Sequence, residues 1–182
     1  GENMKIGIDL DNVLNNLNEE WINTYNEYNN DNLTIEDIKS WDIHKYTKNG
    51  EQIYKYLDVN LFSRLKPLPY SIEITKELQK HYELFVVTAS HPKNIAIKMD
   101  WLNQYFPHIS YDNVIICQRK DLVNVDLLID DAPHNILHFP RHVLVMDYAW
   151  NRDLGNKFPR AKNWKGVYEY LMFGREFKIN EK

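Results

Sequence analysis

The chain has 182 residues, which is enough for one α/β domain with an insertion and for a substantial buried core. Its formal net charge of -4 lacks the basic surplus expected of a protein that binds a nucleic-acid polymer, but a small phosphorylated ligand needs only a local positive charge. The single cysteine, Cys117, excludes an intramolecular disulfide and a zinc site built from cysteines, and its apolar surroundings predict a core residue.

The sequence shows no sign of membrane insertion or export. No apolar run approaches the length of about twenty residues that a membrane span requires, and the first residues lack a signal-peptide pattern. We therefore expect a cytoplasmic protein without a membrane partner. The sequence leaves the oligomeric state open, a homodimer included.

The first predicted element is a buried parallel strand over residues 5–10, and two carboxylates, Asp9 and Asp11, stand at its end. Ligands of open α/β sheets bind at the carboxyl ends of the strands, so this pair could hold a cation, attack an electrophile or move protons. In the alternative interpretation, the two aspartates only mark the end of the strand or cap the segment that follows.

The next part of the chain, residues 17–66, has apolar side chains at helical spacing and nothing that resembles a strand. The pattern predicts short helices over residues 17–28, 35–39 and 53–57. Pro67 and Pro69 form a rigid exit from this segment. We therefore expect a core domain made of residues 4–16 and 67–182, with a helical cap over residues 17–66 inserted after the first strand.

Helices and strands alternate in the rest of the chain. Helices are predicted over residues 71–81, 93–105 and 164–172, and strands over residues 84–87, 114–117, 127–129 and 142–146. This alternation predicts an α/β fold, a Rossmann-like parallel sheet with helices on both faces, in which right-handed crossovers bring all strand ends to one edge. The polar residues expected at that edge are Asp9, Asp11, Thr88, Lys120, Asp130 and Asp131.

Such a cluster of acids is tolerable mainly when a divalent cation neutralises it, and a ligand set made only of oxygen favours Mg²⁺ over zinc or copper. Lys120 adds a positive charge, and the segment Thr88-Ala89-Ser90 offers hydroxyl and backbone N–H groups to phosphate oxygens. A carboxylate such as Asp9 can attack phosphorus to give an aspartyl-phosphate. Asp11 can then protonate the leaving alcohol and later deprotonate the attacking water.

Each of these residues also has an ordinary structural explanation. Thr88 can simply end a strand, Lys120 can be a solvated surface charge, and Asp130-Asp131 can form a turn. The functional interpretation depends on four groups reaching one sheet edge in this order: Asp9 with Asp11, Thr88, Lys120, and Asp130 with Asp131.

This order resembles the haloacid dehalogenase (HAD) superfamily of phosphotransferases. Its motifs are matched by Asp9-Leu10-Asp11-Asn12-Val13, Val86-Val87-Thr88, Lys120 and Leu128-Ile129-Asp130-Asp131. The second aspartate of the first motif is the mark of phosphatase members. Within the superfamily, the chain looks most like the 5'(3')-deoxyribonucleotidases and their bacterial relatives, on the stretches 65–69, 88–92 and 120–131.

The resemblance implies roles for particular residues. Asp9 would be the nucleophile, and Asp11 the acid/base and a metal ligand through its backbone carbonyl. Asp9, Asp11 and Asp131 would hold Mg²⁺, with Asp130 in a supporting role. Thr88 and Lys120 would hold the phosphoryl group, with Ala89 and Ser90 beside them. Asn12 stands where many relatives have glycine.

The expected cap would lie over the strand ends, exclude water and contact the leaving group. It is rich in aromatic side chains, most of which should form the cap's own core: Trp21, Tyr25, Tyr28, Trp41, Tyr46, Tyr54, Tyr56 and Phe62. Trp41 lies in a polar stretch between helices and is our choice for substrate contact. The base-stacking aromatic residues of the eukaryotic relatives do not map cleanly onto this segment.

The sequence thus favours a Mg²⁺-dependent phosphatase, a 5'-nucleotidase similar to the 5'(3')-deoxyribonucleotidases, that hydrolyses (deoxy)nucleoside monophosphates. The alternatives are a HAD phosphatase for another small phosphomonoester, a signalling receiver domain, and a ligand-binding protein without catalysis. The base, the sugar and the position of the phosphate stay open.

Overall fold

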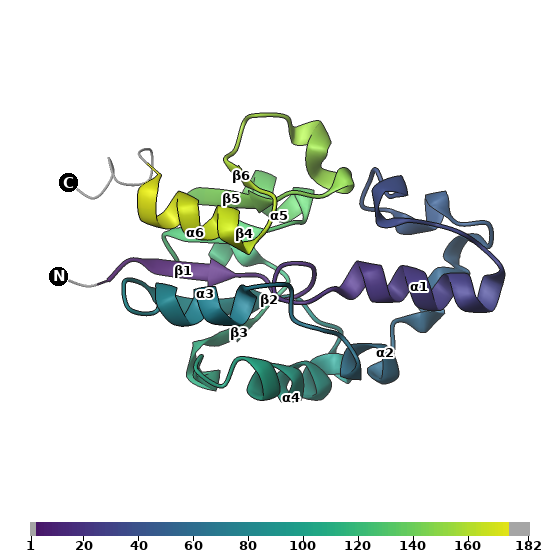
Figure 1. Cartoon of the computed structure of the whole chain (residues 1–182), viewed down its shortest axis with the longest axis horizontal. Helices are drawn as coiled ribbons and strands as arrows, with labels where there is room; N and C mark the ends of the chain where they lie inside the picture. Colours follow the sequence, from purple (N-terminus) through teal and green to yellow (C-terminus); the bar gives the residue numbers. More distant parts are fainter. Residues whose placement is uncertain (1–2, 175–182) are drawn as a thin grey trace.

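The structure is a computed structural model that describes residues 3–174. Its centre is a six-stranded sheet with the strand order β3-β2-β1-β4-β5-β6, in which every neighbouring pair is parallel (Figure 1). The strands are β1 Lys5–Ile8, β2 Glu83–Thr88, β3 Val114–Ile116, β4 Leu127–Asp130, β5 His142–Met146 and β6 Arg160–Ala161. The predicted parallel α/β sheet is confirmed.

Helices cover both faces of the sheet because the central strands alternate apolar side chains between two cores. Leu127 and Ile129 of β4 pack with side chains of the helices α3, α4 and α6, whereas Leu128 packs with Ile136 of α5. The α-helices are α1 Leu17–Asn29, α2 Val59–Ser63, α3 Ser71–Leu78, α4 Ile95–Tyr105, α5 Pro133–His138 and α6 Trp164–Phe173. Within residues 3–174, no helix has both the length and the apolar character needed to cross a membrane.

Several predicted boundaries were wrong, and the causes are local. The first strand ends at Ile8 rather than at residue 10, because the Leu10 carbonyl accepts the backbone N–H groups of Val13, Leu14 and Asn15 and so closes a turn. Helices predicted over 35–39 and from residue 53 are 3₁₀ turns, η1 Ile35–Asp37 and η3 Gly50–Tyr56. A further 3₁₀ turn, η2 Ile43–Tyr46, and the elements α2, α5 and β6 were not predicted, because they are too short to show a period.

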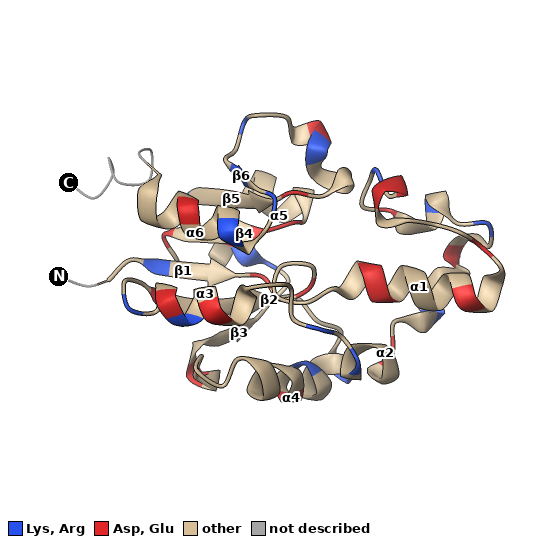
Figure 2. Cartoon of the chain, viewed as in Figure 1, with Lys and Arg blue, Asp and Glu red and all other residues tan. Residues whose placement is uncertain are grey.

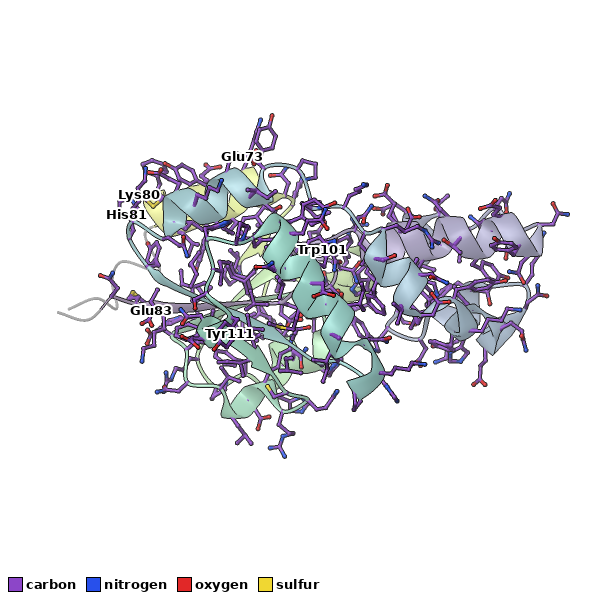
Figure 3. The ribbon with its side chains drawn as sticks, turned by 90° about the horizontal axis from the view of Figure 1, so that it is seen from below. Glu73, Lys80, His81, Glu83, Trp101 and Tyr111 are labelled. Atoms are coloured by element: carbon purple, nitrogen blue, oxygen red, sulfur yellow. The ribbon has the colours of Figure 1, made fainter. Side chains whose placement is uncertain are left out.

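Residues 17–66 contain no strand and lie beyond the carboxyl ends of the sheet strands (Figure 1). Trp21 of α1 donates its Nε1–H to the Ile53 carbonyl at 2.8 Å, which ties α1 to η3. The segment is joined to the sheet by one continuous apolar core, and Trp101 of α4, labelled in Figure 3, donates to the Leu65 carbonyl at 2.8 Å. The role of this segment as a cap, and its domain boundaries, stay predictions.

The two ends of the inserted segment lie side by side. Asn15 and Pro67 form an antiparallel bridge, and the Asn16 N–H donates to the Lys66 carbonyl at 3.1 Å. The Asn16 side chain accepts the Lys66 N–H at 2.8 Å in return. The chain therefore leaves the core and returns to it through one paired crossing.

Candidate active site

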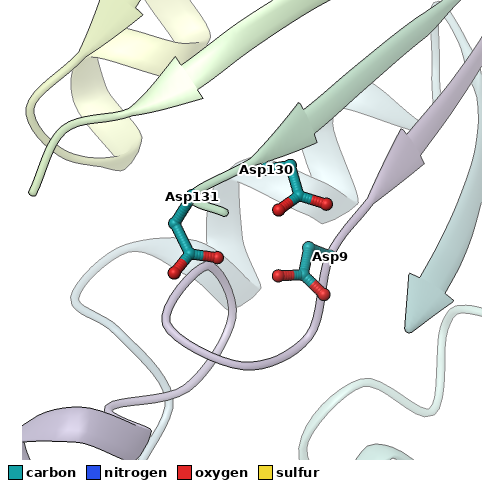
Figure 4. Close-up of side chains that lie close together, drawn as sticks. All are labelled: Asp9, Asp130 and Asp131. Carbon is teal, nitrogen blue, oxygen red and sulfur yellow. The ribbon is translucent and has the colours of Figure 1, made fainter. Parts of the chain in front are cut away.

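Three carboxylates meet where β1 and β4 end. Asp9 follows β1, Asp130 is the last residue of β4 and Asp131 comes next, and the two strands are neighbours with Ile8 opposite Ile129. Figure 4 shows the three side chains facing one another, and Figure 2 shows the acidic residues at these strand ends. One oxygen of each lies within 4.8 Å of the others, and the residues are only 6%, 0% and 1% exposed.

Lys120 partly neutralises this cluster. It lies in a 3₁₀ turn after β3, is 3% exposed, and donates to Asp9 Oδ1 at 2.9 Å and to Asp130 Oδ2 at 2.7 Å. Burial alone would lower the pKa of Lys120, but the Asp130 and Asp9 carboxylates outweigh it and hold that pKa above its usual range. The lysine is therefore a fixed positive charge beside Asp9.

One lysine does not balance three buried carboxylates. Burial, followed by the charge of Asp130, raises the pKa of Asp9 to about 6. Burial and the charges of Asp9 and Asp130 raise the pKa of Asp131 well above its usual range. The cluster therefore holds protons at mildly acidic pH unless another cation replaces them.

The donor set fits a divalent cation. Asp131 Oδ2 accepts the Trp150 indole N–H at 3.2 Å, whereas Asp131 Oδ1 is buried and has no hydrogen-bond partner among the described residues. Asp130 is held instead by Lys120 and by the Ala132 N–H at 2.9 Å. An orphaned carboxylate oxygen inside an all-oxygen set suits a hard cation such as Mg²⁺, and the contacts favour Asp131 over Asp130 as direct ligand.

Asp11 lies outside this group of three. Its Oδ1 accepts the Asn15 amide at 2.9 Å and its Oδ2 accepts the Lys98 ammonium at 2.8 Å, and its side chain is 20% exposed. The side chain thus faces Lys98 of α4, while its backbone stays two residues from Asp9. This placement is compatible with a role in proton transfer and with coordination through the backbone carbonyl.

The predicted phosphate-binding segment follows β2. Thr88 ends that strand and is 2% exposed, and its hydroxyl donates a long hydrogen bond of 3.3 Å to the Ala89 carbonyl. Ala89 lines the cavity described next. Ser90 donates to the His91 carbonyl at 3.0 Å, and its side chain is not among the residues that line that cavity.

A cavity of about 350 Å³ connects the acids with the inserted segment. The sheet edge contributes Asp9, Asp11, Lys120 and Asp131 to its lining, with Trp150 beside Asp131. The inserted segment contributes Trp21, Ile38, Ser40, Trp41, Asp42, Ile43, Tyr54 and Leu57, and His134 of α5 completes this part of the lining. This volume falls in the range of small-molecule sites, and the lining combines charged groups of the sheet edge with aromatic rings of the inserted segment.

Trp41 lines this cavity. It is 49% exposed, and its ring meets that of His134 edge-on at 5.1 Å between centroids. Most of the other aromatic residues of the segment pack in a core, as expected: Trp21, Tyr25, Tyr46, Tyr56 and Phe62. This core is continuous with that of the sheet rather than the segment's own. Trp41 and Tyr54 are the aromatic residues of the segment that are both exposed and next to the cavity.

Comparison with known proteins identifies the family. Residues 3–177 match the family model described as 5' nucleotidase, deoxy (pyrimidine), cytosolic type C protein. The chain belongs to this deoxynucleotidase family. It is 38% identical over 169 residues to a 5'(3')-deoxyribonucleotidase of Bacillus subtilis (strain 168), covering 92% of this chain and 98% of the relative. It is 40% identical over 162 residues to one of Clostridium acetobutylicum, covering 87% and 89%.

The fold of this deoxynucleotidase-family chain is that of the HAD hydrolases. A haloacid dehalogenase-like hydrolase from Streptococcus pneumoniae superposes with a TM-score of 0.65 at 17% identity, covering 92% of this chain and 98% of that one. The resemblance inferred from the strand-end motifs is therefore confirmed, at the level of both family and fold.

The conformation of Asn12, in the loop after Asp9, was not predicted from the sequence. Asn12 has a φ of 65°, a left-handed conformation that asparagine tolerates better than most residues. Its N–H donates to Asn15 Oδ1 at 3.0 Å, and its Oδ1 accepts the Asn18 N–H at 2.8 Å. Asparagine thus tolerates the positive φ of this turn and adds side-chain hydrogen bonds to it.

Lys98 was missed as well. It lies inside α4, where a lysine is ordinarily a solvated surface charge, and no periodic pattern distinguishes it. The one signal that could have found it is the surplus of acids at the sheet edge, which calls for a second buried cation.

Proposed function

We propose that the chain is a Mg²⁺-dependent 5'(3')-deoxyribonucleotidase that hydrolyses deoxyribonucleoside monophosphates through an aspartyl-phosphate intermediate. The observation that carries the proposal is the cavity itself, which is lined both by Asp9, Lys120 and Asp131 and by aromatic side chains of the inserted segment. The identity of 38–40% to proteins named 5'(3')-deoxyribonucleotidase, over most of each chain, supports the choice of substrate.

Asp9 is the nucleophile in this proposal. The Leu10 N–H, at 2.8 Å, and the Lys120 ammonium, at 2.9 Å, both contact Asp9 Oδ1, which orients the carboxylate and leaves Oδ2 for attack. When Oδ2 attacks phosphorus, the P–O bond to the alcohol breaks and Asp11 gives its proton to the departing oxygen. Water then attacks phosphorus, Asp11 takes a proton from it, and inorganic phosphate leaves as the Asp9 carboxylate is restored.

Positive charge makes the approach of two anions feasible. Mg²⁺, held by Asp9, Asp131 and the Asp11 carbonyl, would offset the charge of the phosphoryl group. Lys120, positioned by Asp130, would add a second positive charge at the phosphoryl group, and the Thr88–Ser90 segment would offer backbone N–H groups to its oxygens.

The inserted segment serves as the cap in this proposal. Residues 17–66 cover the strand ends, exclude water from the reaction and contact the nucleoside, with the Trp41 ring packing on the base. A cytoplasmic location, expected from the sequence, stays a prediction.

A substrate panel tests the proposal. Purified protein with Mg²⁺ should release phosphate from deoxyribonucleoside monophosphates with a higher kcat/KM than from ribonucleotides or sugar phosphates, and Asp9→Asn should abolish turnover. Activity confined to sugar phosphates would refute the substrate class, and turnover by Asp9→Asn would refute the aspartyl-phosphate mechanism.

A further inference from the structure

Lys98 is a buried charge at the junction of three parts of the chain. It lies on α4, is 6% exposed, and its ammonium contacts Asp11 Oδ2 at 2.8 Å and the Ala89 carbonyl at 3.2 Å. The same ammonium lies 4.8 Å from the ring centroid of Phe62, which belongs to α2 of the inserted segment. A buried lysine is costly unless it is paired, so these contacts fix its position.

Lys98 is one of two donors that hold the Asp11 carboxylate in place. Lys98 holds Oδ2, and the Asn15 amide holds Oδ1 at 2.9 Å. Asn15 is itself anchored, because its Oδ1 accepts the N–H groups of Asn12 and Leu17. Both oxygens of Asp11 are therefore held by donors, one from its own loop and one from a helix 87 positions away in sequence.

We propose that Lys98 is a positioning residue for proton transfer: it fixes the Asp11 carboxylate relative to the loop that follows Thr88. The inference rests on the proposed function, in which Asp11 exchanges a proton with the leaving group and with water. Lys98 itself does not contact the reacting atoms.

The second contact of Lys98, to the Ala89 carbonyl, links Asp11 to the predicted phosphate-binding segment. The Ala89 carbonyl belongs to the segment that receives the phosphoryl group, so a single ammonium sets the distance between the proton carrier and that segment. A misplacement of about 1 Å in a reacting group can cost on the order of 10²-fold in rate. Because a helix backbone carries Lys98, both contacts share one rigid support.

Phe62 connects this device to the inserted segment. Its ring is 5% exposed and packs against the Lys98 ammonium, so α2 sits directly on the residue that holds Asp11. Because the ring attracts the ammonium through its electron-rich face, this contact links the inserted segment to the residue that holds Asp11.

Leaving-group dependence tests the proposal. An alkyl ester such as a deoxyribonucleoside monophosphate needs a proton on its departing oxygen, whereas p-nitrophenyl phosphate leaves as a stable phenolate. Lys98→Met should lower kcat/KM for the alkyl ester by roughly 10²-fold, the usual scale of general acid catalysis, and for p-nitrophenyl phosphate by far less. Equal losses on both esters, or no loss on the alkyl ester, would overturn the proposal.

A double-mutant cycle shows whether Lys98 acts through Asp11. Asp11→Asn should reproduce the leaving-group pattern, and adding Lys98→Met to it should cause little further loss, because the group that Lys98 positions is already disabled. Additive losses would show that Lys98 acts independently of Asp11, contrary to the proposal.

Lys98→Gln is the matched control, because glutamine keeps a hydrogen-bond donor near Asp11 without the charge. It should retain more activity on the alkyl ester than Lys98→Met, and equal losses would contradict positioning by hydrogen bonding. If Lys98→Met does not fold in a thermal-unfolding assay, the comparison of esters and the cycle are made with Lys98→Gln, for which the loss should be smaller but still larger on the alkyl ester than on p-nitrophenyl phosphate; equal losses on the two esters would again overturn the proposal.

The activity of the wild-type protein on different phosphate esters distinguishes failure of the proposed function from failure of the Lys98 proposal. Hydrolysis of another alkyl phosphate but not of deoxynucleotides would refute the substrate while the Lys98 comparison proceeds on that ester. Failure to hydrolyse any ester would overturn both.

Discussion

Replacing Lys120 with methionine would leave two buried carboxylates without their shared counter-charge. Asp9 and Asp130 are 6% and 0% exposed, so water does not replace the ammonium that now contacts them at 2.9 Å and 2.7 Å. Removing one partner of a buried ion pair costs about 3–5 kcal/mol, which for a chain of this size lowers the melting temperature by roughly 6–20 °C. We expect Lys120→Met to fall in this range at pH 7.5 without metal.

The pH dependence of this loss follows from the pKa of Asp9, which burial and the charge of Asp130 raise to about 6. At pH 5 a proton on the cluster can take the place of the lysine charge, so the destabilisation should be smaller there than at pH 7.5. Adding Asp130→Asn should recover part of the loss at pH 7.5, because it removes one of the stranded charges.

Thermal and urea unfolding in the presence of EDTA, at pH 5 and 7.5, measure these effects. Lys80→Met is the matched control, since Lys80 forms only an exposed pair with Glu77 and should cost less than about 0.5 kcal/mol. A Lys120→Met protein no less stable than the control, or one whose loss is independent of pH, would refute the account of the cluster.

Three further outcomes are expected. The folded pKa of Asp9 lies above its ordinary 3.8, so the stability of the metal-free protein falls as the pH rises from about 4 to 6. Mg²⁺ should therefore raise the melting temperature more at pH 7.5 than at pH 5. An equal rise at both pH values would contradict the displacement of protons by the metal. Trp41→Ala should raise KM for deoxynucleotides about tenfold, because one aromatic stacking contact is lost, and should leave p-nitrophenyl phosphate hydrolysis nearly unchanged. Tyr28→Ala, which replaces an exposed aromatic side chain, is the control. Similar steady-state constants for Trp41→Ala and wild type would exclude the contact. Burial lowers the folded pKa of His108, so its contribution to stability is retained above pH 6.5 and is lost as the pH drops through the folded pKa. Urea titrations should therefore show a smaller decrease in the free energy of unfolding at low pH for His108→Gln than for wild type. An equal decrease would show that other groups cause it.

The strand-end residues could be predicted from sequence because each follows a buried apolar run whose direction the parallel sheet fixes. Right-handed crossovers were expected to bring Asp9, Thr88 and Asp130 to one edge of the sheet, whereas the strand order that makes β2, β1 and β4 neighbours was not predicted. The same reasoning carried the family resemblance, which the comparisons confirm.

Side-chain partners across the fold could not be predicted in this way. The pairing of Lys98 with Asp11 depends on how α4 is rotated against the sheet, and no local pattern encodes that rotation. The positive φ of Asn12 depends on the exact turn after β1. Short elements such as α2 and β6 are stabilised by tertiary packing rather than by their own periodicity, so they also escaped prediction.

The paired crossing at Asn16 and Lys66 has a consequence for how such a protein can change. Because the inserted segment leaves and re-enters the core at one point, residues can be added within it without altering the spacing between β1 and α3. The acids at the sheet edge then keep their geometry while the far wall of the cavity is rebuilt. The residues proposed for the chemistry thus lie on the core, and those proposed for substrate selection lie on the inserted segment, so one can change without the other. This arrangement suits the grafting of a new segment between residues 16 and 66.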